Sequence, residues 1–192
     1  MFARWVGLDL PGSTAFLVMV SVLKVNAVIN KELIVAEARR WVASTWPTLP
    51  EEAGCLYMTL GVILIARVRG IHLIPQGGSV SWLAVHPDHD DGSSPNAAAY
   101  QWDPTHPLSR LSLANGWLPE MHCWAADPER KEIVDITTGL QMTRFKSHFD
   151  WTAAPLPDFL WGKPETGWHY EPNREACLLA MKCMSKTLKL LE

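Results

Sequence analysis

The sequence predicts a single domain that mixes helices and strands. Apolar residues recur at helical spacing near both ends of the chain, whereas the middle holds short strand-like runs separated by Gly and Pro. The 192 residues are enough for one domain with a substantial core and too few for two of ordinary size. Hydrophobic residues make up 48% of the chain and charged residues 19%, which is typical of a globular protein.

The first apolar segment, residues 14–29, predicts a buried helix. Its composition also resembles the apolar part of a signal peptide or a short membrane span, but Lys24 interrupts it and only Arg4 precedes it. A membrane span needs about 20 predominantly apolar residues. We therefore expect no membrane association.

Two further helices are predicted before the strands begin. Asn30 is placed to cap the first, whose apolar residues recur at helical spacing: Leu33, Ile34, Ala38, Trp41 and Val42. Two prolines in "WPTLPEE" break that pattern, and the next helix runs to about Arg69 and ends at Gly70. This helix carries Cys55 and is apolar nearly all round, as expected of a helix at the centre of a domain.

The middle of the chain predicts strands and one long loop. After Gly70, "IHLI" and "SVSWLAV" are strand-like and are separated by "PQGG". Residues 86–107 are polar and have the composition of a loop, which we expect to act as a flap near a functional site. An extended segment rich in Pro and Trp, with Trp151, Trp161 and Trp168, precedes a C-terminal helix capped by Asn173, and we expect this segment to pack over the core.

Residues 120–139, "EMHCWAADPERKEIVDITTG", predict a hairpin that carries a histidine and an aspartate. Pro128 suits the second position of a type I turn, and if Asp127 and Arg130 flank that turn, His122 faces Asp135. Facing side chains on antiparallel strands have Cβ atoms about 4.5–5.5 Å apart, within reach of a hydrogen bond. Because proline excludes the type I′ turn, a longer or bulged loop that shifts this register by one residue stays open as an alternative.

A carboxylate beside a histidine fixes its tautomer and leaves the second ring nitrogen free to take a proton from a nucleophile. Cys55 is the best-placed thiol, because it stands near the start of a helix, where the dipole and unpaired N–H groups lower a thiol pKa. Cys123 follows His122 and should point to the opposite face of the sheet. Cys177 and Cys183 are interpreted as packing residues of the C-terminal helix.

A helix-borne Cys, "RVRGI" leading into a strand, "HCW" on one strand and "IVDITTG" on the next resemble the transglutaminase-like branch of the papain-like cysteine superfamily. The resemblance covers roughly residues 52–139 and implies an α+β domain, with the Cys helix packed on an antiparallel sheet and extra helices at both ends. It implies Cys55 as nucleophile, His122 as general base and acid, and Asp135 as the residue that orients the histidine. The sequence departs from the family at Cys123, where a small alanine-like residue is common, and in its long loop.

Acyl chemistry also needs an oxyanion hole. The backbone N–H of Cys55 is the expected first donor, and Gln76 and the Trp46 indole are candidates for the second. Gln76 is equally well explained as a turn residue of "PQGG".

The predicted function is cysteine-dependent acyl chemistry through a thioester, either hydrolysis or transfer, on a peptide or protein amide or a small acyl donor. It requires no cofactor and no metal. A non-catalytic peptide-binding module on the same fold, with a tryptophan-rich groove, is the alternative. A third hypothesis is a metal-dependent hydrolase that uses the "HPDHDD" cluster, whose candidate ligands are His86, Asp88, His89, Asp90 and Asp91.

Charge and cysteine content bear on partners and compartment. The formal net charge of −3 and the lack of a Lys/Arg block disfavour nucleic acid as a partner. The four cysteines form no C-x-x-C pair, which is typical of free thiols in a reducing compartment. We therefore expect a cytoplasmic protein.

Overall fold

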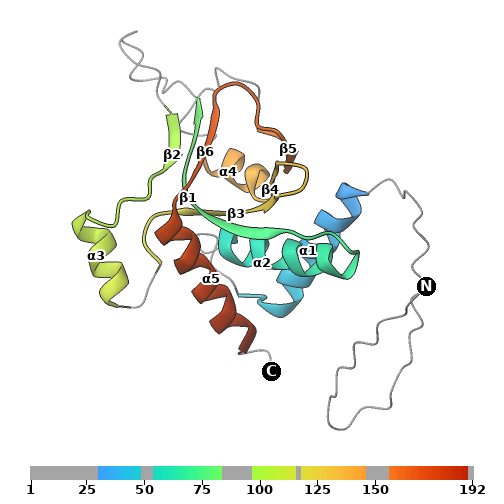
Figure 1. The fold of residues 1–192 in the computed structure, drawn as a ribbon, viewed down its shortest axis with the longest axis horizontal. Helices are drawn as coiled ribbons and strands as arrows, with labels where there is room; N and C mark the ends of the chain where they lie inside the picture. The colour runs from blue at the N-terminus through green and yellow to red at the C-terminus, as the bar shows by residue number, and fades with distance from the viewer. Residues whose placement is uncertain (1–29, 49–53, 84–96, 116–117, 146–155, 190–192) are drawn as a thin grey trace.

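The computed structural model describes residues 30–48, 54–83, 97–115, 118–145 and 156–189. Within these ranges the protein is α+β, with helices on both sides of a six-stranded sheet (Figure 1). The helices are α1 (Lys31–Thr45), α2 (Gly54–Val68), α3 (Pro107–Ala114), α4 (Thr138–Phe145) and α5 (Arg174–Lys189). The strands are β1 (Ile74–Leu83), β2 (Ala97–Tyr100), β3 (His122–Asp127), β4 (Glu132–Asp135), β5 (Leu160–Gly162) and β6 (Trp168–Pro172). The helix predicted at 14–29, the "HPDHDD" cluster and Trp151 lie outside the described residues.

All strand pairs of the sheet are antiparallel, and the long strand β1 organises it. The main path runs β2-β1-β3-β4-β5, and β6 pairs with β1. The first half of β1 pairs with β3, and its second half pairs with both β2 and β6. Gly78 pairs with His122 at the start of β3 and with Pro172 at the end of β6.

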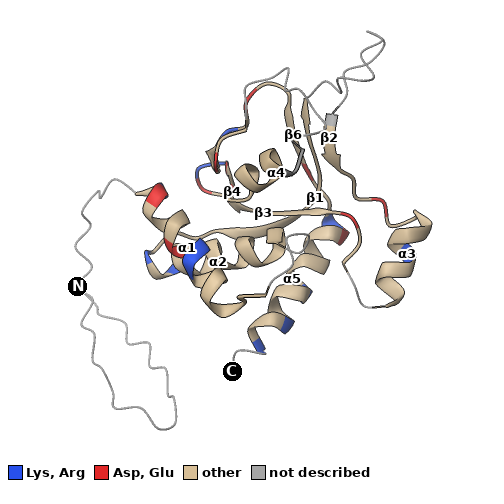
Figure 2. Ribbon diagram, turned by 180° about the vertical axis from the view of Figure 1, so that it is seen from behind, with Lys and Arg blue, Asp and Glu red and all other residues tan. Residues whose placement is uncertain are grey.

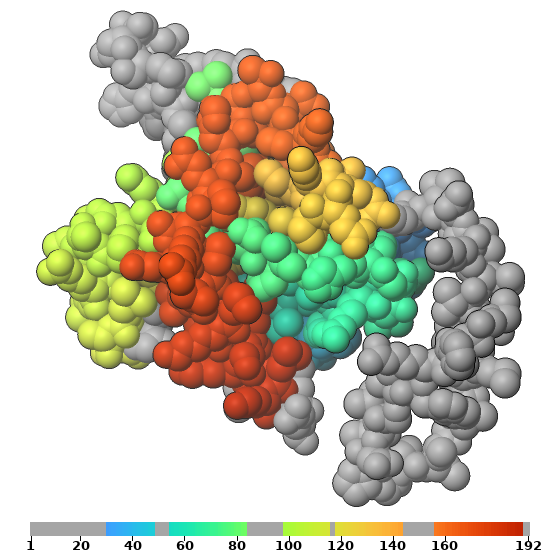
Figure 3. All heavy atoms as spheres, in the orientation of Figure 1, coloured from blue at the N-terminus to red at the C-terminus, as the bar shows by residue number. Residues whose placement is uncertain are grey.

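Helices α1, α2 and α5 lie on one face of the sheet, and α4 lies on the other. Helix α2 packs on β3 and against α1, and α5 packs on β1. In the space-filling view, α5 lies between α3 and α2 (Figure 3). On the opposite face, Met142 of α4 packs against a cluster of buried aromatic and aliphatic residues from β1, β3 and β6.

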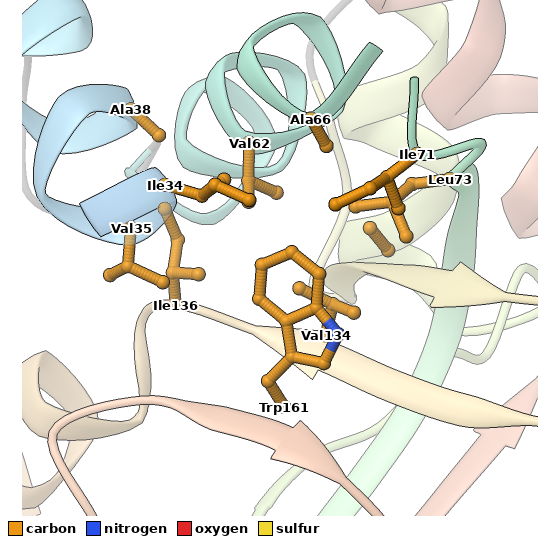
Figure 4. Packing of buried hydrophobic residues seen from close by; sticks show 11 residues of the cluster. Ile34, Val35, Ala38, Val62, Ala66, Ile71, Leu73, Val134, Ile136 and Trp161 are labelled. Carbon is orange, nitrogen blue, oxygen red and sulfur yellow. The ribbon is translucent and has the colours of Figure 1, made fainter. Parts of the chain in front are cut away.

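The apolar core between the helices and the sheet explains why α1 and α2 form where they do. Ile34 and Val35 of α1 and Val62 of α2 meet Val134, Ile136 and Trp161 from the sheet side (Figure 4). The two helices approach closely at Gly61, where an added Cβ would lie 2.7 Å from a methyl group of Val42. This packing confirms that α2 is a central, buried helix, as its apolar sequence predicts.

Three helix ends follow the local sequence signals. The Asn30 side chain accepts a hydrogen bond from Leu33 N at 2.8 Å, and Asn173 accepts one from Glu175 N at 2.9 Å. Gly70 ends α2 with φ of +76°, a conformation that glycine adopts at little cost. These predicted caps are confirmed.

The prediction that "PQGG" separates two strands is wrong, because β1 continues through it. Pro75 is tolerated because this half of β1 pairs on one side only, with β3, so no second ladder needs its missing N–H. Gly77 and Gly78 are required by close packing. A Cβ at Gly77 would lie 2.8 Å from Ala176 O, and one at Gly78 would lie 2.1 Å from Glu171 O.

The polar stretch 86–107 is only partly a loop. Residues 97–100 form β2, which pairs with the second half of β1. Helices α3 and α4 were not predicted. Helix α3 begins with Pro107, and His106 caps it. Helix α4 begins three residues after β4 ends, so the segment "IVDITTG" contains the end of a strand and the start of a helix. The part of the predicted flap at 86–96 lies outside the described residues.

Within the part of the chain that the structure describes, no helix is long and apolar enough to cross a membrane. The basic residues of the helices are spread over several of them, among them α1, α2, α3 and α5 (Figure 2).

Candidate active site

The hairpin of β3 and β4 brings His122 and Asp135 into direct contact. His122 Nε2 lies 2.8 Å from Asp135 Oδ2, and both side chains are only 1% exposed. The predicted register is wrong by two residues, because Asp127 pairs with Glu132 and leaves a loop of residues 128–131. A shift of two residues keeps every side chain on its face, so the pair meets diagonally across the strands.

The longer loop has a local cause. Asp127 Oδ1 accepts hydrogen bonds from the backbone N–H groups of Glu129 at 3.0 Å and Arg130 at 2.9 Å. Lys131 then takes a positive φ of 56°, which returns the chain to β4. An aspartate that bonds its own following backbone favours such a turn.

Asp135 is held by four hydrogen bonds, two to each carboxylate oxygen. Oδ1 accepts from the backbone N and the hydroxyl of Thr137, at 2.9 and 2.6 Å. Oδ2 accepts from His122 and from the Tyr170 hydroxyl, which lies 3.0 Å away. Burial raises the pKa of Asp135, but the charge and hydrogen bond of His122 and the two hydrogen bonds from Thr137 outweigh it and lower the pKa below its ordinary value. The carboxylate is therefore charged and fixed in orientation.

Aromatic rings enclose the imidazole of His122. Tyr100 stacks on it with ring centroids 5.4 Å apart, Trp124 is nearly parallel at 6.2 Å, and Trp82 meets it edge-on at 5.8 Å. The ring can therefore rotate little, and water is kept from it. The Tyr170 hydroxyl has its pKa raised well above the ordinary value, by burial and by the charge of Asp135, so it stays a hydrogen-bond donor.

Cys55 is the second residue of α2 and lies against the start of β3. A hydrogen bond from the Cys123 thiol lowers the pKa of Cys55 most strongly, burial raises it, and the hydrogen bond and charge of His122 lower it further. The resulting pKa of Cys55 lies well below its ordinary value. Burial lowers the pKa of His122, but Asp135 and then Cys55 raise it to about 10. These shifts favour the thiolate form of Cys55 and the imidazolium form of His122.

Because Nε2 of His122 is bound to Asp135, Nδ1 is the ring nitrogen available to Cys55. Nδ1 is buried, and no described atom forms a hydrogen bond of standard geometry with it. The interaction of His122 with Cys55 is thus looser than the one with Asp135. Catalytic hydrogen bonds in unliganded sites are often long and tighten when substrate binds.

The two candidates for a second oxyanion donor are placed differently. Gln76 lies on β1 opposite Trp124, and its Oε1 is 3.4 Å from the Cys177 sulfur. Trp46 ends α1 and packs edge-on against Tyr57, two residues after Cys55, with ring centroids 4.7 Å apart. Gln76 is a strand residue, so its interpretation as a turn residue is wrong, and a donor role stays a prediction for both side chains.

Two cavities share lining residues with the aromatic surroundings of the histidine. One, of about 360 Å³, is lined by Trp124 and Tyr170, the residues that contact His122 and Asp135, and by Gln76. The other, of about 250 Å³, is lined by Tyr100 and by polar residues of β1 and β6. Cys55 lines neither of them, and residues 49–53, which precede it, lie outside the described ranges.

Sequence reasoning missed three residues of this site. Thr137 had a local signal, since a Ser or Thr two residues after an Asp commonly donates to that carboxylate. Tyr170 and the contact of Cys123 with Cys55 had none, because both depend on pairing between distant segments. The orientation predicted for Cys123 is confirmed: it packs with α2 and α5, on the face opposite to Trp124. The expected packing role of Trp161 and Trp168 is also confirmed, because both are buried in core clusters.

Within the described residues, no group of three or more His, Cys, Asp or Glu side chains could hold a metal ion. Comparison with protein-family models, curated proteins and solved structures found no match to this chain.

Proposed function

We propose that the protein is a cysteine-dependent acyl hydrolase or acyl transferase with Cys55, His122 and Asp135 as its catalytic triad. The observation that carries this proposal is the arrangement around His122, with Asp135 on Nε2 and Cys55 on the remaining side of the ring. A buried ion pair that is only structural would not need a thiol with a lowered pKa as the third partner.

The geometry supports the following chemistry. The Cys55 thiolate attacks the carbonyl carbon of an amide or ester, and the imidazolium of His122 donates its Nδ1 proton to the leaving group. The thioester that remains is attacked by water or by an amine, whose proton the neutral ring accepts at Nδ1. Throughout, Asp135 holds Nε2–H and stabilises the positive charge.

The order of elements supports a papain-like, transglutaminase-like fold for this domain. A buried helix carries the Cys near its N-terminus, and the next strands carry the His and then the Asp. The position of Cys55 at the start of α2 places its thiol beside the unpaired N–H groups of the first turn, which favour a thiolate and later an oxyanion.

The test is to mix the protein with an activated acyl ester and follow the acyl adduct by intact mass spectrometry. Wild type should acquire one acyl group at Cys55, and Cys55→Ala should acquire none at any pH, because no atom remains to form the thioester. Cys183→Ala is the matched control, since it also removes a partly exposed thiol but lies on α5. An adduct that forms equally fast in Cys55→Ala would end the proposal.

A non-catalytic peptide-binding module is the second candidate. It is favoured by one observation: the two cavities that include Tyr100, Trp124 and Tyr170 are lined by aromatic and polar residues but not by Cys55. A binding module would bind peptides equally well with and without the Cys55 thiol and would form no adduct in the same experiment.

A further inference from the structure

Two cysteines from different elements, Cys55 of α2 and Cys123 of β3, pack in one cluster at the start of β3. Cys123 is adjacent to His122 in the chain but projects to the opposite face, where α2 packs. There both side chains belong to one packed cluster between α2, β3 and α5, and Cys123 is the group that lowers the pKa of Cys55 most strongly. Cys55 is partly exposed, whereas Cys123 is buried at 1% exposure.

The two thiols differ in a way that suits oxidation in a fixed order. The pKa of Cys55 is lowered, which favours the nucleophilic thiolate form of its sulfur. The pKa of Cys123 is raised, by its hydrogen bond to Cys55 and by burial, so it keeps its proton. A low-pKa, accessible thiol next to a second cysteine is the arrangement found in redox-sensitive sites.

We propose that Cys55 and Cys123 form a disulfide when the protein meets a hydroperoxide, and that this bond switches the candidate active site off. The first part rests on the packing of both side chains in one cluster between α2 and β3, and the second rests on the proposed function of Cys55. Neither cysteine of α5 is among the groups that shift the pKa of Cys55. The Cys177 sulfur, for example, lies 3.4 Å from both Gln76 Oε1 and Gly77 O.

The reaction takes two steps. The Cys55 thiolate attacks one oxygen of hydrogen peroxide, so that an S–O bond forms, the O–O bond breaks and hydroxide leaves. The Cys123 sulfur then attacks the sulfenic acid at Cys55. An S–S bond forms, the S–O bond breaks, and water leaves with the Cys123 proton. The peroxide gains two electrons and the two thiols lose them; a dithiol such as dithiothreitol returns them and restores both thiols.

The consequence for the site is direct. In the disulfide, the Cys55 sulfur is no longer a thiolate. It therefore cannot attack a carbonyl, and no thioester forms. The oxidised sulfur is also protected from the irreversible sulfinic and sulfonic acids, because the disulfide can be reduced. The pair thus stops acyl chemistry and preserves the nucleophile.

The experiment treats the full chain with hydrogen peroxide and maps disulfides by mass spectrometry of peptides under non-reducing conditions. The expected product joins the peptides of Cys55 and Cys123, with loss of acyl-adduct formation and full recovery after dithiothreitol. Cys183→Ala should behave as wild type. In Cys123→Ala, Cys55 should instead be labelled by dimedone, which traps sulfenic acid, and recovery by dithiothreitol should fall as oxidation proceeds.

A cross-link from Cys55 to Cys177 or Cys183, or a stable sulfenic acid at Cys55 in the wild type, would overturn the proposal. The disulfides found in the wild type decide between these outcomes even if Cys123→Ala fails to fold. Reduced protein that forms no acyl adduct would refute the proposed function alone, since disulfide formation is read separately. An adduct in the reduced protein without any disulfide after peroxide would refute the redox proposal alone.

Discussion

The two faces of the sheet bury their residues in different ways. On the helix face, the cluster around Ile34 and Val62 is entirely apolar and is held by packing alone. On the opposite face, His122 and Asp135 are as fully buried, but each depends on specific hydrogen bonds. Val134 and Asp135 are neighbours on β4, yet they belong to these two environments.

In this fold, stability comes mainly from the apolar helix face, whereas the candidate chemistry is located on the opposite face. An apolar core tolerates small changes in side-chain shape. When a buried apolar side chain is truncated, the loss of stability grows roughly with the volume that is removed. A buried charge is costly unless every partner is present, so a small chemical change on the polar face should affect function far more than packing.

Asp135→Asn should lower acyl turnover by about 10⁴-fold, equivalent to about 5 kcal/mol, while the domain stays folded. Asparagine nearly matches aspartate in volume, but it offers an NH₂ group to the histidine, favours the wrong tautomer and cannot stabilise the imidazolium. Turnover of an activated ester, together with circular dichroism of the folded state, measures both effects. Turnover within tenfold of wild type would mean that the pair is structural only.

Ile34→Ala should lower the free energy of unfolding by about 2–5 kcal/mol and leave turnover per folded molecule unchanged. Ile34 is 2% exposed in the apolar cluster, and it lies on α1, which contributes no residue to the candidate site. Urea unfolding gives the stability, and the ester assay gives the turnover. A large fall in turnover with unchanged stability would contradict the separation of the two faces.

Tyr170→Phe should reduce turnover by about tenfold, since a hydrogen bond to a charged group contributes about 1.5 kcal/mol. The change removes one donor from Asp135 Oδ2 and leaves His122 and Thr137 in place. Loss of that donor raises the pKa of Asp135, so the acid limb of the pH profile of turnover should move to higher pH. A role in packing alone would leave the pH profile where it is.

The smallest effect is expected for the wild type, when turnover is measured as a function of pH. The pKa of His122 is raised from 6.5 to about 10, so turnover should fall as pH rises through about 10, where the ring loses the proton that it gives to the leaving group. By the same shift, His122 contributes stability that is fully present below pH 6.5 and is lost as pH rises to about 10.

The lowered pKa of Cys55 gives a separate test that needs no substrate. Its lowered pKa predicts that iodoacetamide alkylates Cys55 much faster at pH 7 than it alkylates Cys183, whose pKa is raised by burial. In His122→Asn the rate at Cys55 should fall, and its onset should move to higher pH. Equal alkylation rates for the two cysteines in the wild type would contradict the thiolate.

Much of the local structure was determined by the sequence itself. Asn30, Gly70 and Asn173 mark helix ends through contacts within a few residues, and the apolar pattern of α2 predicts its burial. The identities of the three candidate catalytic residues also followed from the sequence, because each stands on an element of a type that suits its role. Such signals need no knowledge of distant segments.

The tertiary structure alone decided the register and the surroundings of the site. The hairpin register depends on the turn that Asp127 builds, and "PQGG" becomes strand only because β3 pairs with it on one side and α5 and β6 crowd its glycines. Tyr170 reaches Asp135, and Cys123 reaches Cys55, through pairings between segments far apart in the chain. The physical reason is that a local pattern fixes the face on which a side chain lies, whereas the partner on that face is fixed only when the sheet and helices pack together.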